Sequence, residues 1–278
     1  MKLAIVGIFY DGYYDMWEDF LHIFHANWPD CPYPVYIVNQ EKELDFSVDF
    51  KITVLHAGKE SEYSKKIKKV VDEIDADYYL LLLEDFFIGD KLEKDMLNPV
   101  LDFIERNNVK YFGFNWNLFG PDKRFGFAPT SIKKNSEYTI VSANNIFERE
   151  FLKRCVGDGN FNAWVFEGIY AKSKTAHTQA FLEGCFKNKY NFLHLYHGAL
   201  QGKLLPHTIK HFEKENYSLK TKREVLTNRR VFLAKVKNLV KMIIPRFLLR
   251  FFKKILRKKG VLDRYSKQIK EESKKLGL

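Results

Sequence analysis

Two carboxylates, Glu84 and Asp85, directly follow the most apolar run of the sequence, residues 78–83. A buried strand that ends in carboxylates presents them at the edge of a sheet, where they can hold a divalent cation. That cation would bridge two phosphates and neutralise a diphosphate leaving group. The structural alternative is that Glu84 caps the following turn and Asp85 is a solvated loop residue. The spacing alone supports both interpretations equally.

A third carboxylate, Glu167, lies among the aromatic residues Trp164, Phe166 and Tyr170. Desolvation by such neighbours raises the pKa of a carboxyl group, which suits a general base. A base of this kind would take the proton from an attacking hydroxyl group. On the residues alone, a surface glutamate on an amphipathic helix is the more frequent alternative.

Two further features lie near residue 200. The run Gly198–Lys203 is no P-loop, because its spacing differs and neither Ser nor Thr follows the lysine. Lys203 could still close over a diphosphate, and a plain turn with a solvated lysine is the alternative. Of four late histidines, His197 is closest to this loop, and it is the one that we favour as a metal ligand. The others are His194, His207 and His211.

Hydrophobic periodicity predicts the elements that must position these residues. Short apolar runs predict strands, and apolar residues at helical spacing predict helices. The expected strands are 3–8, 35–38, 52–55, 78–83, 110–114 and 138–142, and the expected helices are 14–27, 61–74, 92–107, 145–156 and 163–186.

This alternation predicts an α/β fold, Rossmann-like, with a mostly parallel sheet covered by helices on both faces. Ligands of such sheets bind beyond the carboxyl ends of the strands. Glu84 and Asp85 are expected at such an end. Tyr10 and Asp11 follow the first strand, where a nucleobase and its ribose could bind.

The stretch 77–87 resembles the acidic-motif strand of GT-A glycosyltransferases, and more narrowly that of bacterial enzymes that build capsular polysaccharide and lipopolysaccharide. The helix that begins near Tyr63-Ser64 is similar to the one before that strand. The resemblance spans about residues 1–205. It implies a nucleotide-sugar donor bound under the N-terminal half of the sheet, with Ser64 among its contacts.

The sequence departs from the family in one respect. The usual motif is Asp-x-Asp, whose second carboxylate binds the metal, whereas this chain has Glu84-Asp85-Phe86. The resemblance implies Asp85 as the ligand of a Mn²⁺ or Mg²⁺ ion, helped by Glu84 and His197, and it leaves metal dependence open. It also implies Glu167 as the base that faces a glycan or lipid-linked glycan acceptor, and Lys203 as a contact to the diphosphate.

Charge is unevenly distributed along the chain. Residues 220–275 hold 20 of the 46 lysines and arginines but 4 of the 35 acidic residues, so the preceding part is mildly acidic. A core that grips nucleic acid would usually be basic itself, and we therefore expect no nucleic-acid partner. The change predicts a domain at 1–218, with a donor half (1–115) and an acceptor half (116–218), followed by a tail at 219–278.

The tail contains the pattern of an interfacial helix. Pro245 suits a first helical turn, and the apolar and basic residues after it fall on opposite arcs. The apolar arc holds Phe247, Leu248, Phe251, Phe252 and Ile255, and the basic arc holds Arg246, Arg250, Lys253, Lys254, Arg257 and Lys258. We expect basic amphipathic helices that contact an anionic membrane through 229–259. The alternative is a helix that docks its apolar face on the core.

The three cysteines and the absence of an uncharged apolar stretch long enough to span a bilayer favour a cytoplasmic protein at the inner face of the plasma membrane. Two other functions stay open. One is a non-catalytic α/β protein that binds membrane or nucleic acid. The other is a nucleotidyltransferase, which would need basic residues in the loop after the first strand.

Overall fold

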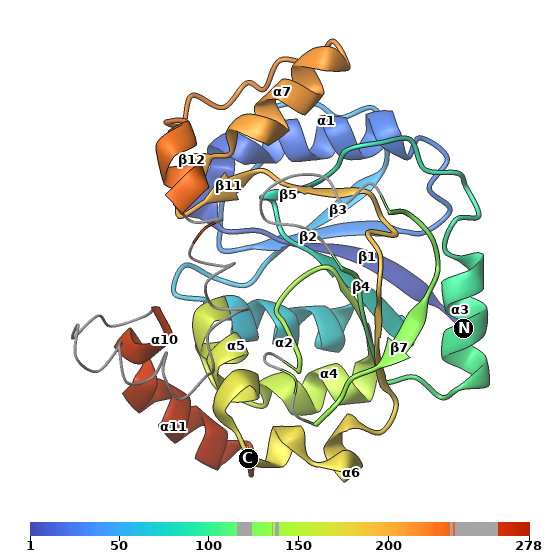
Figure 1. Ribbon diagram of the computed structural model, residues 1–278, viewed down its shortest axis with the longest axis vertical. Helices are drawn as coiled ribbons and strands as arrows, with labels where there is room; N and C mark the ends of the chain where they lie inside the picture. The colour runs from blue at the N-terminus through green and yellow to red at the C-terminus, as the bar shows by residue number, and fades with distance from the viewer. Residues whose placement is uncertain (116–123, 135, 137–138, 234–235, 237–260) are drawn as a thin grey trace.

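The computed structural model describes residues 1–115, 124–134, 136, 139–233, 236 and 261–278. Within them, eight strands form one sheet in the order β3-β2-β1-β4-β8-β6-β9-β7 (Figure 1). Their bounds are β1 Leu3–Ile8, β2 Val35–Asn39, β3 Ile52–His56, β4 Tyr78–Leu82, β6 Tyr111–Gly113, β7 Pro129–Ser131, β8 Asn145–Glu148 and β9 Cys185–Asn188.

Most of the sheet is parallel. β1 pairs in parallel with β2 and β4, β2 with β3, and β6 with β9. β8 runs antiparallel between β4 and β6, and β7 pairs antiparallel with β9 at the edge. All six residues of β1 are buried, because helices cover both faces of the sheet.

The helices form two layers around this sheet (Figure 1). Ile5 of β1 belongs to the core cluster on one face, and the next residue, Val6, belongs to the cluster on the other. On the first face lie α1 (Trp17–Asn27), α3 (Asn98–Arg106) and α7 (Pro206–Lys214), and on the second lie α2 (Tyr63–Glu73), α4 (Arg149–Val156) and α5 (Ala163–Lys172). The predicted α/β, Rossmann-like fold class is therefore confirmed.

Short elements complete the described chain. Two small antiparallel sheets pair β5 (Phe86–Ile88) with β10 (Leu195–His197) and β11 (Ala199–Leu200) with β12 (Lys203–Leu204). The remaining elements are the 3₁₀ helices η1 (Asp11–Met16) and η2 (Thr175–His177) and the helices α6 (Gln179–Leu182), α10 (Val261–Arg264) and α11 (Ser266–Lys275).

Three element predictions were wrong. The helix predicted at 145–156 begins as strand β8, because Ile146 and Phe147 are buried on opposite faces of the sheet. The helix predicted at 163–186 ends at Lys172 and is followed by η2, α6 and β9. The described residues 139–142 form no strand, since the turns there present backbone and side-chain groups to Tyr63 and Glu167.

The described residues beyond 218 pack on the core. Residues 220 and 221 donate backbone hydrogen bonds to the buried Asp19 of α1. α11 covers α5, with Ile269 buried against Gly168. The predicted boundary at 218 thus marks a change in charge rather than a break in packing. The interfacial helix expected at 245–255 lies outside the described residues, as does most of 229–259. None of the described helices is long and apolar enough to cross a membrane.

Candidate functional site

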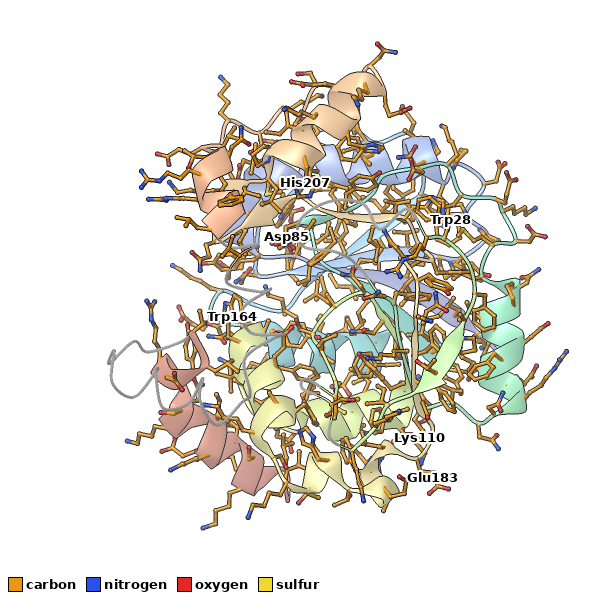
Figure 2. All side chains as sticks on the ribbon, in the orientation of Figure 1. Trp28, Asp85, Lys110, Trp164, Glu183 and His207 are labelled. Carbon is orange, nitrogen blue, oxygen red and sulfur yellow. The ribbon has the colours of Figure 1, made fainter. Side chains whose placement is uncertain are left out.

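The strand order has a topological switch point between β1 and β4, the place where open α/β sheets form their ligand crevice, and we call the region beyond these two strand ends the crevice. From β1 the chain leads to β2 and β3 on one side, and α2 then returns it to β4 on the other side of β1. In open α/β sheets, ligands bind beyond the carboxyl ends of the strands at such a switch point. Tyr10 follows β1 there, and Glu84 and Asp85 follow β4. Figure 2 labels Asp85 at this edge of the sheet.

Asp85 is paired with His197. Oδ2 of Asp85 lies 3.4 Å from Nε2 of His197, and the backbone N–H of Gly198 donates to the Asp85 carbonyl at 2.6 Å. The imidazole stacks on the ring of Phe86 with 4.4 Å between the ring centroids. The other carboxylate oxygen, Oδ1, is buried and has no hydrogen-bond partner among the described residues. The structure therefore brings these two predicted residues together and leaves one oxygen available for a ligand.

Glu84 does not join this pair. Its Oε1 accepts a hydrogen bond from the backbone N–H of Tyr10 at 3.3 Å. Burial, followed by the charge of Asp85, raises the pKa of Glu84 to about 8, so its carboxyl group is largely protonated at neutral pH. Within the described residues, no group of three or more His, Cys, Asp or Glu side chains could hold a metal ion. Glu84 thus contacts the backbone of Tyr10 rather than His197, and its role as a metal ligand stays a prediction.

A divalent cation still fits Asp85 and His197 under one condition. Mg²⁺ is commonly bound by one or two carboxylates, by substrate phosphates and by water. One carboxylate and one imidazole give an incomplete protein shell, so the phosphates of a bound nucleotide would have to supply further ligands. Residues and ligand would then form the metal site together.

Glu167 faces the site from α5. The Ser142 hydroxyl donates to its Oε1 at 2.8 Å, and the Ser142 N–H donates at 3.3 Å. The Tyr63 hydroxyl holds this segment by donating to the Ser142 carbonyl at 2.5 Å. Burial raises the pKa of Glu167, and the charge of Asp85 raises it further. Glu167 is therefore not an exposed surface glutamate, and it shares an electrostatic environment with Asp85.

Tyr13 and Arg223 form a wall of the site that the sequence analysis missed. The Arg223 guanidinium lies 3.8 Å from the centroid of the Tyr13 ring. It also donates to the Asp15 carboxylate at 2.7 and 2.8 Å and to the Gly12 carbonyl at 2.8 Å. Burial and the charge of Asp85 raise the pKa of Tyr13. A Cβ on Gly202 would lie 3.6 Å from both groups, so the β11–β12 turn adjoins them.

Lys66 is the second cation at this edge that the sequence analysis missed. Its side chain is buried, and its Nζ donates to the Phe9 carbonyl at 2.6 Å. Burial lowers the pKa of this amine, while the charge of Glu84 partly opposes that effect. The Nζ also lies 5.6 Å from the ring centroid of Tyr10. No sequence signal separates Lys66 from its neighbours, because it belongs to a lysine-rich helix, and Arg223 falls in the segment that we interpreted as tail.

The other predicted donor contacts have structural partners. Asp11 accepts the backbone N–H groups of residues 40–42 at 3.0 to 3.1 Å, which ties the ends of β1 and β2 together. Ser64 is fully buried, and its hydroxyl donates to the Gly159 carbonyl and accepts from the Phe161 N–H. Ser64 cannot reach a nucleotide without losing these bonds, so it is dropped from the site. Lys203 is paired with Glu224.

A cavity of about 170 Å³ lies at the ends of β6, β8 and β9. Its lining mixes apolar side chains with the polar residues Thr139, Asn145, Lys187 and Asn188. The Asn145 amide is held by the Tyr111 hydroxyl and the Val141 carbonyl, at 2.9 and 2.8 Å. The lining residues come from both predicted halves of the domain, residues 111–115 from the donor half and residues 132–188 from the acceptor half.

Comparison with known proteins gives similarity in structure only. The chain matches no protein-family model, and no curated protein matches its sequence. It is similar to the crystal structure of S. aureus TarS, with a TM-score of 0.40 and 14% identity over 62% of this chain and 54% of that one. A TarS structure in complex with UDP-GlcNAc gives a TM-score of 0.39, also at 14% identity, over 62% of this chain and 53% of that one.

A cytidylyltransferase from Leptospira borgpetersenii gives a TM-score of 0.41 and 11% identity over 82% of this chain and 100% of that one. This chain spans about half the length of the TarS chain that it matches. Likenesses of this size carry no argument about activity. The chain has an α/β sheet with a crevice at its switch point, and its function has to be argued from the residues in that crevice.

Proposed function

We propose that this protein is a nucleotide-sugar-dependent glycosyltransferase that adds a sugar to a bacterial surface glycan of the capsule or lipopolysaccharide type. One observation carries the proposal. The Asp85–His197 pair lies beyond the carboxyl end of β4, and the charge of Asp85, together with burial, raises the pKa of the Glu167 carboxyl group. A base and a site for the leaving phosphate are the two groups that glycosyl transfer to a hydroxyl requires.

In this reaction the acceptor oxygen bonds to the anomeric carbon of the donor. Glu167 takes the hydroxyl proton, and the bond between that carbon and the phosphate oxygen breaks, with its electron pair leaving on the diphosphate. Asp85 and His197 would hold a Mn²⁺ or Mg²⁺ ion, which supplies charge neutralisation at the diphosphate when it is bound. The raised pKa of Glu167 brings the base closer to the operating pH.

The donor nucleotide would occupy the crevice after β1. Tyr10 is half exposed there, and its ring and that of Tyr13 are 6.1 Å apart between centroids. Lys66 and Arg223 hold the carbonyls of Phe9 and Gly12 in the same loop. These aromatic faces and cations suit a base and a diphosphate.

The acceptor half and the tail complete the proposal. The cavity near Asn145 has polar side chains that suit hydroxyl groups of a glycan or a lipid-linked glycan. The basic sequence of 229–259 suits an anionic membrane surface. We therefore place the enzyme in the cytoplasm at the inner face of the plasma membrane.

The test is a thermal-shift and titration screen of the full chain against UDP-, GDP-, CDP- and CMP-linked sugars, with and without Mn²⁺. We expect one donor class to bind and Asp85→Ala to weaken that binding. Asp90→Ala is the matched control, because Asp90 pairs with His194 at 3.3 Å beyond the other end of the same small sheet. Equal losses in both variants would contradict the proposal.

Two other outcomes would replace the proposal. Binding of a nucleoside triphosphate in preference to every nucleotide sugar would favour a nucleotidyltransferase. Lys66 and Arg223 could then supply the basic side chains that the loop after the first strand lacks. A folded chain that binds no nucleotide would favour a non-catalytic binding protein.

A further inference from the structure

Two described segments flank residues 237–260, and the one that precedes them in the sequence is fixed beside η1. The buried Asp19 carboxylate accepts the Tyr217 hydroxyl at 2.9 Å and the N–H groups of Lys220 and Thr221 at 2.8 and 3.0 Å. Farther along, the Leu226 N–H donates to the Leu204 carbonyl of β12 at 2.8 Å. The chain therefore reaches residue 226 on the side of the crevice formed by η1 and the β11–β12 turn.

The second flanking segment is fixed to α5, the helix that carries Glu167. Ile269 of α11 is buried, and a Cβ on Gly168 would lie 2.3 Å from its Cδ1. The glycine is what lets the two helices approach this closely. In Figure 1 the two flanking segments lie above and below the left edge of the sheet, where β1 and β4 end. The two segments thus lie on opposite sides of the crevice.

Large apolar side chains are exposed at this edge. Phe232 and Leu233 are 64% and 56% exposed, and Trp164 at the start of α5 is 46% exposed. Figure 2 places Trp164 below Asp85 on the same side of the molecule. Phe232 and Leu233 are adjacent in the sequence and both largely exposed, and grouped exposed apolar side chains mark protein-binding or membrane-binding sites.

The charge of this region is of one sign. Arg229 and Arg230 directly precede Phe232 and Leu233, and between Glu224 and Asp263 the sequence has 12 Lys or Arg and no acidic residue. Bulky apolar side chains interspersed with basic ones match the interface of an anionic bilayer.

We propose that the edge formed by Trp164, Arg229, Arg230, Phe232 and Leu233 docks on an anionic membrane surface, so that the crevice at the ends of β1 and β4 opens onto the lipid headgroups. If the proposed function also holds, the acceptor is a hydroxyl group presented at that surface by a lipid-linked glycan. Because the two flanking segments lie on opposite sides of the crevice, docking through both would set the orientation of the enzyme as well as its attachment.

The test is co-sedimentation of the full chain with vesicles of phosphatidylcholine, alone or mixed with phosphatidylglycerol. We expect the chain to sediment with the mixed vesicles only. Phe232→Ser/Leu233→Ser and Trp164→Ser should each lower the partition coefficient about tenfold or more. Arg229→Gln/Arg230→Gln should lower it severalfold, with the loss greatest at low salt.

Two matched controls should sediment like the native chain. Phe125→Ser removes an aromatic side chain that is 42% exposed and stacks on His194, and Lys94→Gln removes an exposed charge in the loop before α3. If these controls lose as much binding as the edge variants, the proposed surface is wrong. If Trp164→Ser binds normally while the Phe232/Leu233 variant does not, the crevice does not face the bilayer.

Vesicle binding requires neither donor nor acceptor, so this test is separate from the test of activity. A chain that sediments with vesicles but binds no nucleotide sugar would keep the docking surface and lose the proposed function. A chain that ignores vesicles and is dimeric in solution, becoming monomeric as Phe232→Ser/Leu233→Ser, would show that this edge binds a second copy instead.

Discussion

Asp85 and His197 lie 112 positions apart in the sequence, yet Oδ2 of the one is 3.4 Å from Nε2 of the other. The β5–β10 pairing creates this contact, because it places His197 opposite Phe86, the residue after Asp85. A second pair, Asp90 and His194, flanks the other end of the same two strands at 3.3 Å. Variants of the Asp90–His194 pair can therefore serve as controls for variants of the Asp85–His197 pair.

The proposed metal-binding role of His197 can be tested with His194 as the control. We expect His197→Gln to raise the Mn²⁺ concentration needed for half-maximal donor binding about tenfold or more, because it removes a nitrogen ligand next to Asp85. The measurement is a Mn²⁺ titration of donor affinity. His194→Gln should leave the titration unchanged. An unchanged titration in His197→Gln would remove the histidine from the metal site.

The role of Glu167 can be separated from its contribution to packing. Glu167→Gln keeps the size of the side chain and its ability to accept from Ser142 but cannot take a proton. We expect the rate of transfer to fall at least about 100-fold, while donor affinity stays within about twofold. Transfer rate and donor affinity are measured on the same preparation. A variant that retains full activity would show that another group is the base.

Ser142→Ala is the companion variant. The hydrogen bonds from Ser142 favour the ionised form of Glu167 and lower its pKa against the effect of burial. Losing the hydroxyl should therefore raise that pKa and move the acidic limb of the pH–rate profile to higher pH. Movement to lower pH would contradict the assignment.

Glu84 should make the stability of the protein depend on pH. Its pKa is about 8 in the folded protein, against an ordinary value of 4.5. Below about pH 4.5 the carboxyl group is protonated in both the folded and the unfolded state, so the pKa shift does not change the free energy of unfolding. Between these values the unfolded chain releases the proton and the folded chain keeps it, so the free energy of unfolding falls as pH rises.

Glu84→Gln cannot ionise and should escape this loss. Relative to the native protein, we expect its free energy of unfolding to increase between about pH 4.5 and 8, by on the order of 2 to 4 kcal/mol. Urea unfolding at a series of pH values measures the difference. A difference that shrinks over the same range would mean that the carboxyl group is ionised in the folded protein.

Asp19 should be worth far more to stability than its neighbour Glu18. Asp19→Ala leaves the N–H groups of residues 220 and 221 and the Tyr217 hydroxyl without their acceptor, which we expect to cost about 2 to 4 kcal/mol. Glu18 pairs with Lys220 at the surface, and Glu18→Ala should cost less than about 1 kcal/mol. Urea unfolding of both variants gives the comparison, and similar costs would contradict it.

The sequence predicted the N-terminal half of the fold better than the rest. β1 matches its predicted bounds, and β2, β3 and β4 differ by a residue at their carboxyl ends. These strands are continuous apolar runs between clear turn signals. β8 was missed because a central strand that is buried on both faces has no alternation, and α4 follows it without a break. Local periodicity cannot separate such a strand from the helix that it leads into.

The candidate site, like the fold, could be predicted from the sequence only in part. Asp85, Glu167 and Tyr10 could be proposed from chemistry at strand ends and among aromatic residues. Arg223 could not, because it reaches the crevice only through the Asp19 and Asp15 contacts, which are about 200 residues away in sequence. Glu84 looked equivalent to Asp85, although adjacent side chains at a strand end point in different directions and meet different environments.

The packing of α11 on α5 should hold the folded protein together after its backbone is cut. Both segments that flank residues 237–260 are tied to the folded body, one by Asp19 and one by Ile269. Cleavage of the backbone within that stretch would therefore release neither piece. The nicked protein should elute as a single species under native conditions and give two bands on a denaturing gel. The C-terminal fragment, supplied separately, becomes a candidate for reassembly with the remainder of the chain.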